Sequence, residues 1–543
     1  MVNGRHTSSR RYGYVRSPDQ DAVPPARHRV VIVGGGLVGL TMAIELQSKG
    51  VQAIVLEKSD ALSEGSRSIC QAKRTLEIWD RLGVGDVMVE RGVEWRTGKV
   101  FNQDRLLYSF DLLPEGGYKM PAFVNLQQYC VEEYLVARLT ELGGEVRWRN
   151  KVTSVEQFDD GVLINIETPE GLYQLDCEWL IACDGARSGV RRQLGLAFDG
   201  RVFKDKFLIT DVRMKGEFPN ERWFWFEPTF HSGQTALLHR QADDIWRIDL
   251  QLGWEADSDE EKKSENVKRR IQAMLGENAQ FEIDWISVYV FQCRTLEDYV
   301  HGRVIFAGDA AHQVSPFGAR GGNAGVLDVD NLGWKLKLVL DGAAPPSLLE
   351  TYSHERVFAA HENILHSTRA TEFITPKSNT SRILRDQTLA LAAKYPFAQS
   401  LVNSGRLSVP ANLTDTALST PDEDSFDCGI APGSPAQDAP LCANGRDGWL
   451  LNELKGEFTA LAYETNGLNL PSQIDVGGIT VAVKSVGEGL GLADAKSSVR
   501  KRYDMKPGTV YLFRPDQHVA ARWRSWSETR LEESVERAAG RHA

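Results

Sequence analysis

Residues 30–39 read Val30-Val31-Ile32-Val33-Gly34-Gly35-Gly36-Leu37-Val38-Gly39, and the architecture of the protein can be worked out from this stretch. Its four apolar residues are typical of a buried parallel strand, and the glycines that follow match the pattern GxGxxG. Gly34 permits a tight turn, Gly36 lets a pyrophosphate approach the backbone at a helix start, and Gly39 allows that helix to pack closely. The stretch predicts a strand, a phosphate-binding turn and a helix that Gly50 stops.

A second strand is predicted at residues 51–56, and Glu57 stands at its carboxyl end, 21 residues after Gly36. A carboxylate at this place in a βαβ unit can accept hydrogen bonds from ribose hydroxyls. Two further apolar runs, residues 179–183 and 304–307, are predicted to add strands to the same sheet. The strand, turn, helix and acid together favour dinucleotide binding over a glycine turn with a purely structural role.

Two later segments distinguish between the dinucleotides. Residues 183–191 read Cys-Asp-Gly-Ala-Arg-Ser-Gly-Val-Arg, and residues 303–325 contain Gly308-Asp309-Ala310-Ala311-His312 followed by four glycines between positions 318 and 325. Asp309 follows a short buried strand, where its carboxylate can accept hydrogen bonds from a polyol chain. The glycines allow the backbone to lie against a flat ring ahead of a helix N-terminus.

With these three segments in this order, the chain resembles the single-component flavoprotein aromatic hydroxylases, which include the p-hydroxybenzoate and phenol hydroxylases. The resemblance implies an α/β fold: a Rossmann-type FAD-binding domain with an inserted antiparallel β-sheet domain for the substrate. One departure is Ala319-Arg320, which stands where a Gly-Gln pair is common. The residues that the motifs and the resemblance assign to the cofactor are Gly34, Gly36, Leu37, Val38, Gly39, Glu57, Lys58, Arg67, Gln128, Asp184, Arg191, Asp309, Pro316, Gly321, Gly322 and Asn323.

The resemblance also implies which part of FAD these residues bind. Gly36 and Glu57 would hold the adenosine end, and Asp309 the ribityl chain. Residues 321–323 would line the isoalloxazine, while the segment 184–191 is associated in the family with both FAD and nicotinamide binding.

The tail carries a further resemblance. Residues 511–520 read Tyr-Leu-Phe-Arg-Pro-Asp-Gln-His-Val-Ala, similar to a segment of the thioredoxin-like C-terminal domain in the phenol hydroxylase and 3-(3-hydroxyphenyl)propionate hydroxylase branch. This segment has no CxxC pair, so we expect a structural or dimer-forming role instead of redox work. The expected organisation is a flexible arm at 1–28, an FAD-binding domain at 29–195 and 301–375, a substrate-binding sheet at 196–300, a helical linker at 376–426 and a thioredoxin-like domain at 427–543.

Candidate catalytic residues lie in the predicted inserted sheet. Apolar and polar residues alternate over residues 246–251, so Arg247, Asp249 and Gln251 share one face, and the preceding strand offers His239. If this sheet covers a flavin, that face looks into the substrate pocket, and His239 or Asp249 is the candidate base. By resemblance, Arg247 lies near the flavin. An exposed sheet face with a surface ion pair is the alternative reading.

Composition excludes several other classes. The 63 Lys and Arg against 74 Asp and Glu give a formal charge of −11, which disfavours nucleic acids and anionic membranes as partners. No apolar run is long enough for a membrane span. The seven cysteines form no CxxC pair, which predicts reduced thiols in a cytoplasmic protein. His361 and His366 are five residues apart and so do not share a helix face, and we expect no metal site.

The expected enzyme is an FAD-dependent monooxygenase that uses NADH or NADPH and O2 to hydroxylate a phenolic compound through a flavin hydroperoxide, in aromatic catabolism and as a homodimer. The chain has no second dinucleotide fingerprint, so the nicotinamide cofactor would bind transiently. An unperturbed phenol has a pKa near ~10, so a positioned base would help at neutral pH. The alternatives are a flavin-dependent halogenase or reductase of the same fold and a non-enzymatic flavin-binding sensor.

Overall fold

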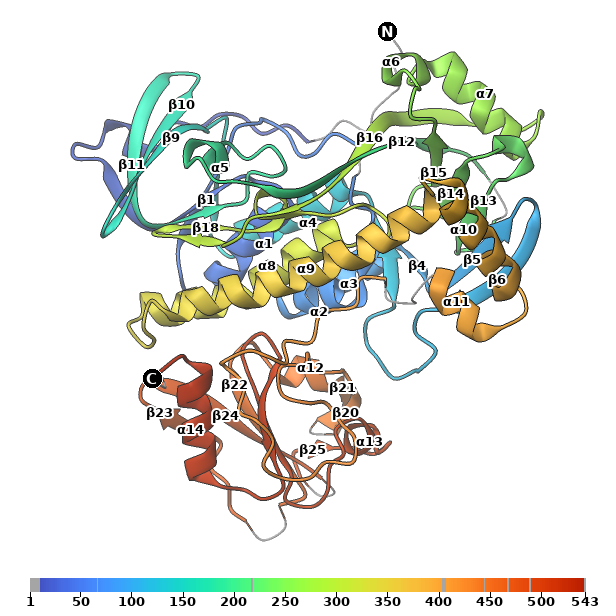
Figure 1. The fold of residues 1–543 in the computed structure, drawn as a ribbon. Helices are drawn as coiled ribbons and strands as arrows, with labels where there is room; N and C mark the ends of the chain where they lie inside the picture. Colours follow the sequence, from blue (N-terminus) through green and yellow to red (C-terminus); the bar gives the residue numbers. More distant parts are fainter. Residues whose placement is uncertain are drawn as a thin grey trace.

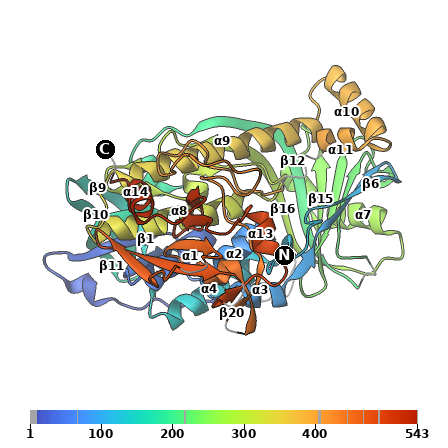
Figure 2. The ribbon, with the colours of Figure 1, turned by 90° about the horizontal axis from the view of Figure 1, so that it is seen from below.

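The computed structural model describes residues 10–65, 67–215, 218–402, 407–443, 445–465, 468–487 and 490–541. Over these residues the strands form three eight-stranded sheets and one three-stranded sheet. Figure 1 shows the C-terminal part of the chain as a separate body against the helices of the first part, and Figure 2 shows the same packing from below.

The first sheet is built around the predicted βαβ unit. Its parallel strands lie side by side in the order β18-β11-β1-β2-β8, while β17 pairs antiparallel at one edge and β10 and β9 extend β11. The strands are β1 (Ala26–Val33), β2 (Ala53–Glu57), β8 (Glu145–Trp148), β9 (Lys151–Phe158), β10 (Gly161–Thr168), β11 (Gly171–Ala182), β17 (Val300–His301) and β18 (Val304–Phe306). The apolar runs 179–183 and 304–307 therefore join the sheet predicted for them.

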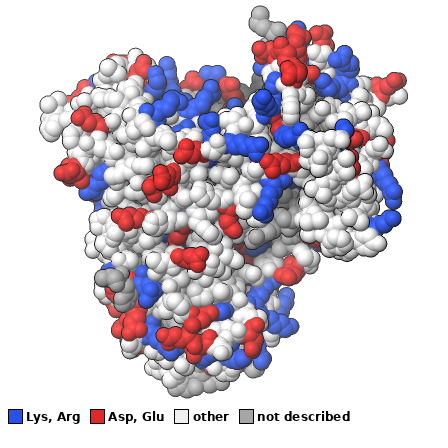
Figure 3. Space-filling model, in the orientation of Figure 1, with Lys and Arg blue, Asp and Glu red and all other residues white. Residues whose placement is uncertain are grey.

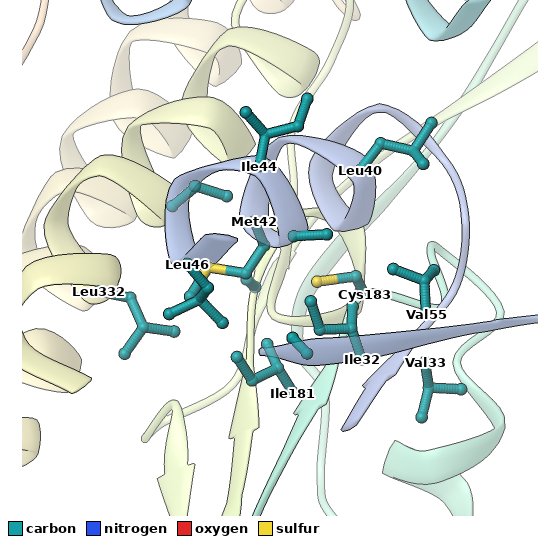
Figure 4. Packing of buried hydrophobic residues seen from close by; sticks show 14 of the residues in the cluster. Ile32, Val33, Leu40, Met42, Ile44, Leu46, Val55, Ile181, Cys183 and Leu332 are labelled. Carbon is teal, nitrogen blue, oxygen red and sulfur yellow. The ribbon is translucent and has the colours of Figure 1, made fainter. Parts of the chain in front are cut away.

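Helix α1 (Leu37–Ser48) packs on this sheet and closes the main core. Ile32 and Leu40 have no exposed surface, and Figure 4 shows α1 side chains facing residues of β1 and β11. Helices α4 (Gln128–Glu141) and α8 (Gly321–Leu340) contact α1, so its polar N-terminal end is fixed relative to both. The remaining short helices of this region are α2 (Lys73–Arg81), α3 (Gly85–Arg91) and α5 (Gly189–Gln193).

The second sheet is the predicted insertion, with three additional strands, β5, β6 and β19. Its order is β19-β16-β12-β15-β14-β13-β5-β6. The expected boundary placed residues 97–111 in the nucleotide-binding domain, but β5 pairs in parallel with β13 and extends the inserted sheet instead. The strands are β5 (Thr97–Asn102), β6 (Arg105–Asp111), β12 (Asp199–Arg213), β13 (Arg222–Phe226), β14 (Thr235–Arg240), β15 (Ile245–Leu252), β16 (Glu282–Thr295) and β19 (His312–Gln313).

Different elements cover the two faces of the second sheet. Helix α7 (Ser264–Leu275), preceded by α6 (Ser258–Glu261), buries Val267 and Ile271 against one face. Helix α9 (Leu348–Ile374) runs along the molecule from the first sheet to the other face of the second sheet (Figure 1). Helices α10 (Asn379–Ala392) and α11 (Pro396–Val402) follow it within the predicted helical linker. A small sheet of β3 (Cys70–Ala72), β7 (Phe123–Asn125) and β4 (Val93–Trp95) is formed by the chain between β2 and β8.

The third sheet forms the C-terminal domain, with the order β21-β20-β25-β24-β22-β26-β27 and β23 paired to β24. Strands β22 and β24 are parallel, and β26 and β27 follow as antiparallel neighbours. The thioredoxin-like assignment stays a prediction. The elements are β20 (Pro440–Ala443), β21 (Arg446–Trp449), α12 (Leu450–Glu453), β22 (Phe458–Tyr463), β23 (Gln473–Val476), β24 (Ile479–Val486), β25 (Leu492–Ala493), α13 (Ser498–Arg502), β26 (Val510–Phe513), β27 (Val519–Trp523) and α14 (Glu528–Ala538).

Part of the expected N-terminal arm is ordered against the first sheet. Residues 1–9 lie outside the described residues, but Tyr12 stacks on Trp148 with ring centroids 4.1 Å apart. Asp19 accepts hydrogen bonds from Arg147 at 2.7 Å and contacts His28 at 2.8 Å. These contacts bury apolar and charged groups together, so the segment from residue 10 onward is not a flexible arm.

The surface and the helices bear on the expected partners. In the face shown in Figure 3, basic and acidic side chains are interspersed. No helix in the described ranges is long and apolar enough to cross a membrane. Within the same ranges, no group of three or more His, Cys, Asp or Glu side chains is placed to hold a metal ion.

Candidate active site

The glycine turn after β1 leaves no room for a side chain at Gly34 or Gly39. Gly34 has φ +109°, and a Cβ added there would lie 2.5 Å from the Cys183 carbonyl oxygen. A Cβ added at Gly39 would lie 1.9 Å from the Gly34 carbonyl oxygen. Gly36 forms the N-cap of α1 without a side-chain cap, so the first N–H groups of the helix are open to an anion.

Glu57 is held against this turn by backbone groups. Its Oε2 accepts the Gly35 N–H at 2.7 Å and its Oε1 accepts the Ser59 N–H at 2.7 Å. These two bonds fix the carboxylate at the end of β2, where it remains half-buried and can accept further hydrogen bonds. Lys58, beside it, is exposed.

A second acid faces the turn from α4. Glu132 is 1% exposed and accepts hydrogen bonds from the N–H of Ser63 at 2.8 Å and from Gln128 Nε2 at 2.9 Å. A Cβ at Gly36 would lie 3.9 Å from Glu132 Oε1. Burial raises the pKa of Glu132, and the bonds from Ser63 and Gln128 oppose that rise. Gln128 Oε1 also accepts the Ser68 N–H at 3.3 Å, so its amide contacts the loop that carries Arg67 as well as Glu132.

The segment 184–191 is hydrogen-bonded to the segment 308–312. Asp184 Oδ2 accepts the N–H groups of Gly189 at 2.6 Å and Val190 at 3.2 Å. Arg191 is buried and donates to the carbonyl oxygen of Ala310 at 2.7 Å. The other carboxylate oxygen, Asp184 Oδ1, is buried without a hydrogen-bond partner among the described residues, so one acceptor remains for a ligand.

Asp309 stands where the sequence predicted it, directly after the fully buried β18. The Gly308 N–H donates to Asp328 Oδ2 at 2.9 Å, and Asp328 is held in turn by His312 and Arg356, each at 2.7 Å. The Asp309 side chain is accessible, yet protein surrounds it closely enough that burial raises its pKa, against the charges of His312, Arg67 and Arg191.

Asp309 also faces the start of α8. A Cβ added at Gly321 would lie 4.0 Å from Asp309 Oδ1, so the glycine leaves open space in front of the carboxylate. Arg67 is exposed and influences both Asp309 and Tyr289 of β16 electrostatically. Asp309 also influences Tyr289, so the second sheet lies close to the Asp309 carboxylate.

The side chain of Asn323 forms hydrogen bonds within the protein. Its side chain is 2% exposed and its Oδ1 accepts the Ala72 N–H at 2.9 Å, while its Nδ2 donates to the Cys70 carbonyl at 2.9 Å. The amide thus joins β3 to α8, and the expected place of Asn323 beside the isoalloxazine stays a prediction. Gly322 is packed beside Ser68, whose Oγ lies 2.4 Å from an added Cβ, while Pro316 is exposed.

These residues fit a dinucleotide such as FAD. The turn excludes a Cβ at Gly34 and at Gly39. Asp184 Oδ1 lacks a partner among the described residues, and Asp309 is accessible after a buried strand. FAD would be held by the turn and Glu57 at one end and by Asp309 with Gly321 at the other. Leu37 and Val38 contribute packing, since Val38 lies against Gly308 and Gly325.

The register of the second sheet brings the candidate catalytic residues onto one face. His239 of β14 lies opposite Arg247 of β15. Leu237 of β14 lies opposite Asp249 of β15 on one side and opposite Phe224 of β13 on the other. Because residues opposite one another point to the same side, Phe224 shares the face of Asp249. Trp225 points to the other side and packs in the core under α7. The aromatic run 223–226 is thus half pocket wall and half core.

Arg247 is committed to an ion pair. Its Nε and terminal nitrogen donate to Asp211 at 2.9 and 2.8 Å, and both residues are buried. Gln241 donates to the same carboxylate at 2.8 Å. Arg247 therefore provides a fixed positive charge that acts on Asp249, and its expected place near the flavin stays a prediction.

Burial shifts the pKa values of His239 and Asp249 in opposite directions. Burial, assisted by the charges of Arg222 and Arg247, holds the pKa of His239 well below its usual range, so its imidazole is neutral. Burial raises the pKa of Asp249 to about 6, against the lowering effect of Arg247 and Arg222. His239 Nδ1 and Asp249 Oδ1 are buried with no hydrogen-bond partner among the described residues.

A cavity of about 320 Å³ adjoins this face. Sequence reasoning missed Arg222, which lines the cavity and is close enough to shift the pKa of both His239 and Asp249. The alternation of β13 was the available signal, since it puts Arg222, Phe224 and Phe226 on one face. The aromatic walls of the cavity are Phe110, Phe224, Phe226, Phe317 and Phe373.

Comparison with known proteins agrees with this geometry. Residues 27–367 match the family model described as FAD binding domain. The chain is 31% identical over 412 residues to the 12-dehydrotetracycline 5-monooxygenase/anhydrotetracycline 6-monooxygenase of Streptomyces rimosus, covering 68% of this chain and 78% of the relative. It is 26% identical over 380 residues to a 3-(3-hydroxy-phenyl)propionate/3-hydroxycinnamic acid hydroxylase of Mycolicibacterium smegmatis, covering 70% and 67% of the two chains.

A solved structure shows that the fold is shared over nearly the whole chain. The flavin-dependent monooxygenase PieE, crystallised with FAD and substrate, superposes with a TM-score of 0.80 at 23% identity, covering 95% of this chain and 99% of that one. The family match covers more than half of the 543 residues. The chain therefore belongs to the FAD binding domain family, as an FAD-dependent aromatic monooxygenase.

Proposed function

We propose that this enzyme uses NADH or NADPH and O2 to hydroxylate a phenolic compound bound between β13 and α9, with Asp249 as the base. The observation that carries the proposal is the environment of Asp249. Its Oδ1 has no partner among the described residues, its pKa is raised to about 6, and it shares a sheet face with the wall of the aromatic cavity. A general base works best with a pKa near the operating pH.

The protein residues can divide the work as follows. FAD, when bound, passes electrons from the nicotinamide cofactor to O2 and supplies the oxygenating chemistry. Asp249 Oδ1 takes the phenol proton, and the Arg222 guanidinium stabilises the phenolate that forms. Deprotonation makes the ring electron-rich, which favours attack on an electrophilic oxygen. The buried, aromatic walls exclude water from the reacting ring.

The size of the cavity favours a substrate with more than one ring. A cavity of roughly 150 Å³ is enough to hold benzene, and this one measures about 320 Å³. The two relatives are named for a tetracycline-type and a single-ring substrate respectively. We therefore propose a fused polycyclic phenol as the preferred substrate, and place a single-ring phenol of aromatic catabolism second.

The test is a panel of one-ring, two-ring and fused multi-ring phenols, each supplied with NADH and with NADPH. We expect stimulated cofactor oxidation and a product heavier by one oxygen atom for at least one multi-ring phenol. Cofactor oxidation that no phenol stimulates would favour the flavin-binding sensor, and a reduced or halogenated product would favour the other enzyme classes of this fold.

We also propose a homodimer that works in the cytoplasm. All seven cysteines are free thiols, as is usual in a reducing compartment. Helices α10 and α11 expose Ile383, Leu384, Phe397 and Leu401, each by more than half of its surface, and a cluster of exposed apolar side chains is typical of an interaction surface. Light scattering at several protein concentrations would give the mass; a monomer throughout would refute the dimer.

A further inference from the structure

An N-terminal segment, residues 10–22, lies beside the end of β2 that carries Glu57. The family match begins after this segment. The Tyr12 N–H donates to the Asp60 carbonyl oxygen at 2.7 Å, and the Arg11 guanidinium donates to the Asp60 carboxylate at 3.1 Å. Asp60 follows Glu57 closely in sequence, so the segment is hydrogen-bonded to the loop that leaves β2.

The ring of Tyr12 covers Trp148, the last residue of β8. The two rings are stacked, with centroids 4.1 Å apart and an angle of 6° between their planes. Trp148 lies opposite Glu57 in the pairing of β2 with β8. Because a carboxylate at the place of Glu57 is suited to ribose hydroxyls, the Tyr12 ring lies where the adenosine end of FAD would be bound.

The hydroxyl group of Tyr12 is a buried donor that the protein leaves unused. Its Oη has no hydrogen-bond partner among the described residues. Burial raises the pKa of Tyr12, and the charge of Arg10 opposes that rise. Glu133 and Glu132 of α4 also act on the hydroxyl, and Glu132 is the acid that faces Gly36 of the glycine turn. Buried polar groups are nearly always hydrogen-bonded, so an unused donor at this place indicates a ligand.

The segment has a second anchor, at the end of β10. The Tyr14 hydroxyl donates to Thr168 Oγ1 at 3.4 Å, and Arg16 donates to Glu170 at 2.7 Å. These contacts do not involve Tyr12, so a change of Tyr12 leaves the second anchor in place. Tyr14 also provides a tyrosine of the same segment for comparison.

We propose that residues 10–14 close the adenosine end of the FAD site, with the Tyr12 ring as part of its wall and the Tyr12 hydroxyl as a donor to the adenosine moiety. The inference rests on the assignment of Glu57 to that end. An enclosed cofactor dissociates only after the segment detaches, so FAD retention should depend on Tyr12. By linkage, bound FAD should also hold the segment in place.

The first experiment measures the dissociation constant of FAD from the full-length protein by quenching of flavin fluorescence. We expect Tyr12→Ala to weaken FAD binding about 10-fold, because it removes one aromatic wall and one hydrogen-bond donor. Tyr12→Phe keeps the ring and should weaken binding only about 3-fold. Tyr14→Ala is the control and should leave the constant unchanged.

A second measurement on the wild type needs no variant. Arg10, Arg11 and Arg16 are exposed, so trypsin can cleave the segment when it detaches. With saturating FAD we expect this cleavage to be about 10-fold slower than in the apoprotein. In Tyr12→Ala the protection should be lost. Cleavage after Lys496, which is exposed in the C-terminal domain, is the internal control and should not respond to FAD.

Four results would overturn the inference. Unchanged FAD affinity in Tyr12→Ala would show that the ring is not part of the site, and tighter binding would show that the ring occupies the place of the adenosine. An equal loss in Tyr14→Ala would assign the effect to general stability of the segment. Equal cleavage of the segment with and without FAD would show that FAD does not hold it. If circular dichroism shows that Tyr12→Ala is unfolded, Tyr12→Phe and the cleavage of the wild type decide.

Discussion

At the scale of single residues, burial acts in opposite directions on the two candidate bases. It lowers the pKa of His239 and raises that of Asp249 to about 6. An imidazole whose pKa lies far below its usual range binds a proton weakly. The Asp249 carboxyl group is ionised at neutral pH, and its pKa is close to that pH. Asp249 is therefore the better proton acceptor, and His239 is better suited to hydrogen bonding with the substrate.

The Asp249→Asn variant should keep FAD and lose hydroxylation by about 100- to 10,000-fold, the usual contribution of a general base. Nicotinamide oxidation should continue with H2O2 as the product. Asparagine removes a charge that burial disfavours, so the melting temperature should not fall. His239→Gln is the matched comparison and should weaken substrate binding more than it slows turnover. Normal coupling in Asp249→Asn would show that the base lies elsewhere.

The pH dependence follows from the same carboxylate. Asp249 accepts a proton only when ionised, so kcat/KM for the substrate should fall about tenfold per unit as the pH drops below about 6. Above that pH, the protonation state of Asp249 should no longer change kcat/KM. In Asp249→Asn this acidic limb should be absent, and its survival in the variant would assign it to another group.

Removing the charge of Asp309 should weaken the binding of FAD more than it destabilises the fold. The carboxylate is accessible at the end of β18, and loss of one charge-assisted hydrogen bond costs about 1.5–3 kcal/mol, or roughly 10- to 150-fold in affinity. Equilibrium dialysis of Asp309→Ala against FAD, with circular dichroism as the check on folding, measures it. Wild-type affinity in this variant would contradict the assignment.

At the scale of elements, the sequence predicted what local chemistry determines. The turn between β1 and α1 is specified by glycines within six positions, so pattern and structure agree there. The pairing of β5 with β13 joins segments more than a hundred residues apart, and no local pattern encodes it. The partners of Arg247 and Asn323 were missed for the same reason, because Asp211 and β3 are distant in sequence.

Gly39→Ala tests the turn as an element. The added Cβ would lie 1.9 Å from the Gly34 carbonyl oxygen, so α1 must move away from β1. Overpacking of this kind costs about 1–3 kcal/mol, and we expect a lower melting temperature together with loss of bound FAD. Gly116→Ala is the control, since nothing lies within 4 Å of its added Cβ. Equal behaviour of the two variants would contradict the close approach.

At the scale of the whole molecule, a buried charge network joins the C-terminal domain to α8 and α9. Arg514 donates to Glu355 at 2.7 and 3.1 Å and to Asp516, and Lys335 donates to Glu355 at 2.7 Å. All four side chains are at most 3% exposed. Because α8 also begins beside Asp309, the domain supports the helix that lines the flavin end of the groove.

Arg514→Gln should therefore destabilise the whole protein by about 3–5 kcal/mol, since it leaves buried carboxylates uncompensated. Arg530→Gln, which breaks only exposed pairs with Glu423 and Asp424, should cost at most ~1 kcal/mol. Thermal unfolding measures both, and equal small losses would show that the network is not what joins the domains.

The network also determines how the stability of the protein should change with pH. Arg514 and Lys335 hold the pKa of Glu355 far below its usual range. A carboxylate with a depressed folded pKa contributes stability that is present above its ordinary pKa and is lost as the pH falls through the folded value. Below about pH 4 the wild type should lose stability faster than Arg514→Gln does, as urea unfolding at several pH values would show.

The central claim is that this chain transfers one oxygen atom from O2 to a phenol bound beside Asp249. Turnover under 18O2 with NADH or NADPH, and with the phenol that stimulates oxidation most, tests it directly by mass spectrometry of the product. We expect one 18O atom in the hydroxylated ring for each nicotinamide oxidised. In Asp249→Asn this coupling should be lost, and nicotinamide oxidation should yield H2O2 instead of the hydroxylated product. A product whose oxygen comes from water, or O2 converted wholly to H2O2 with every phenol, would contradict it.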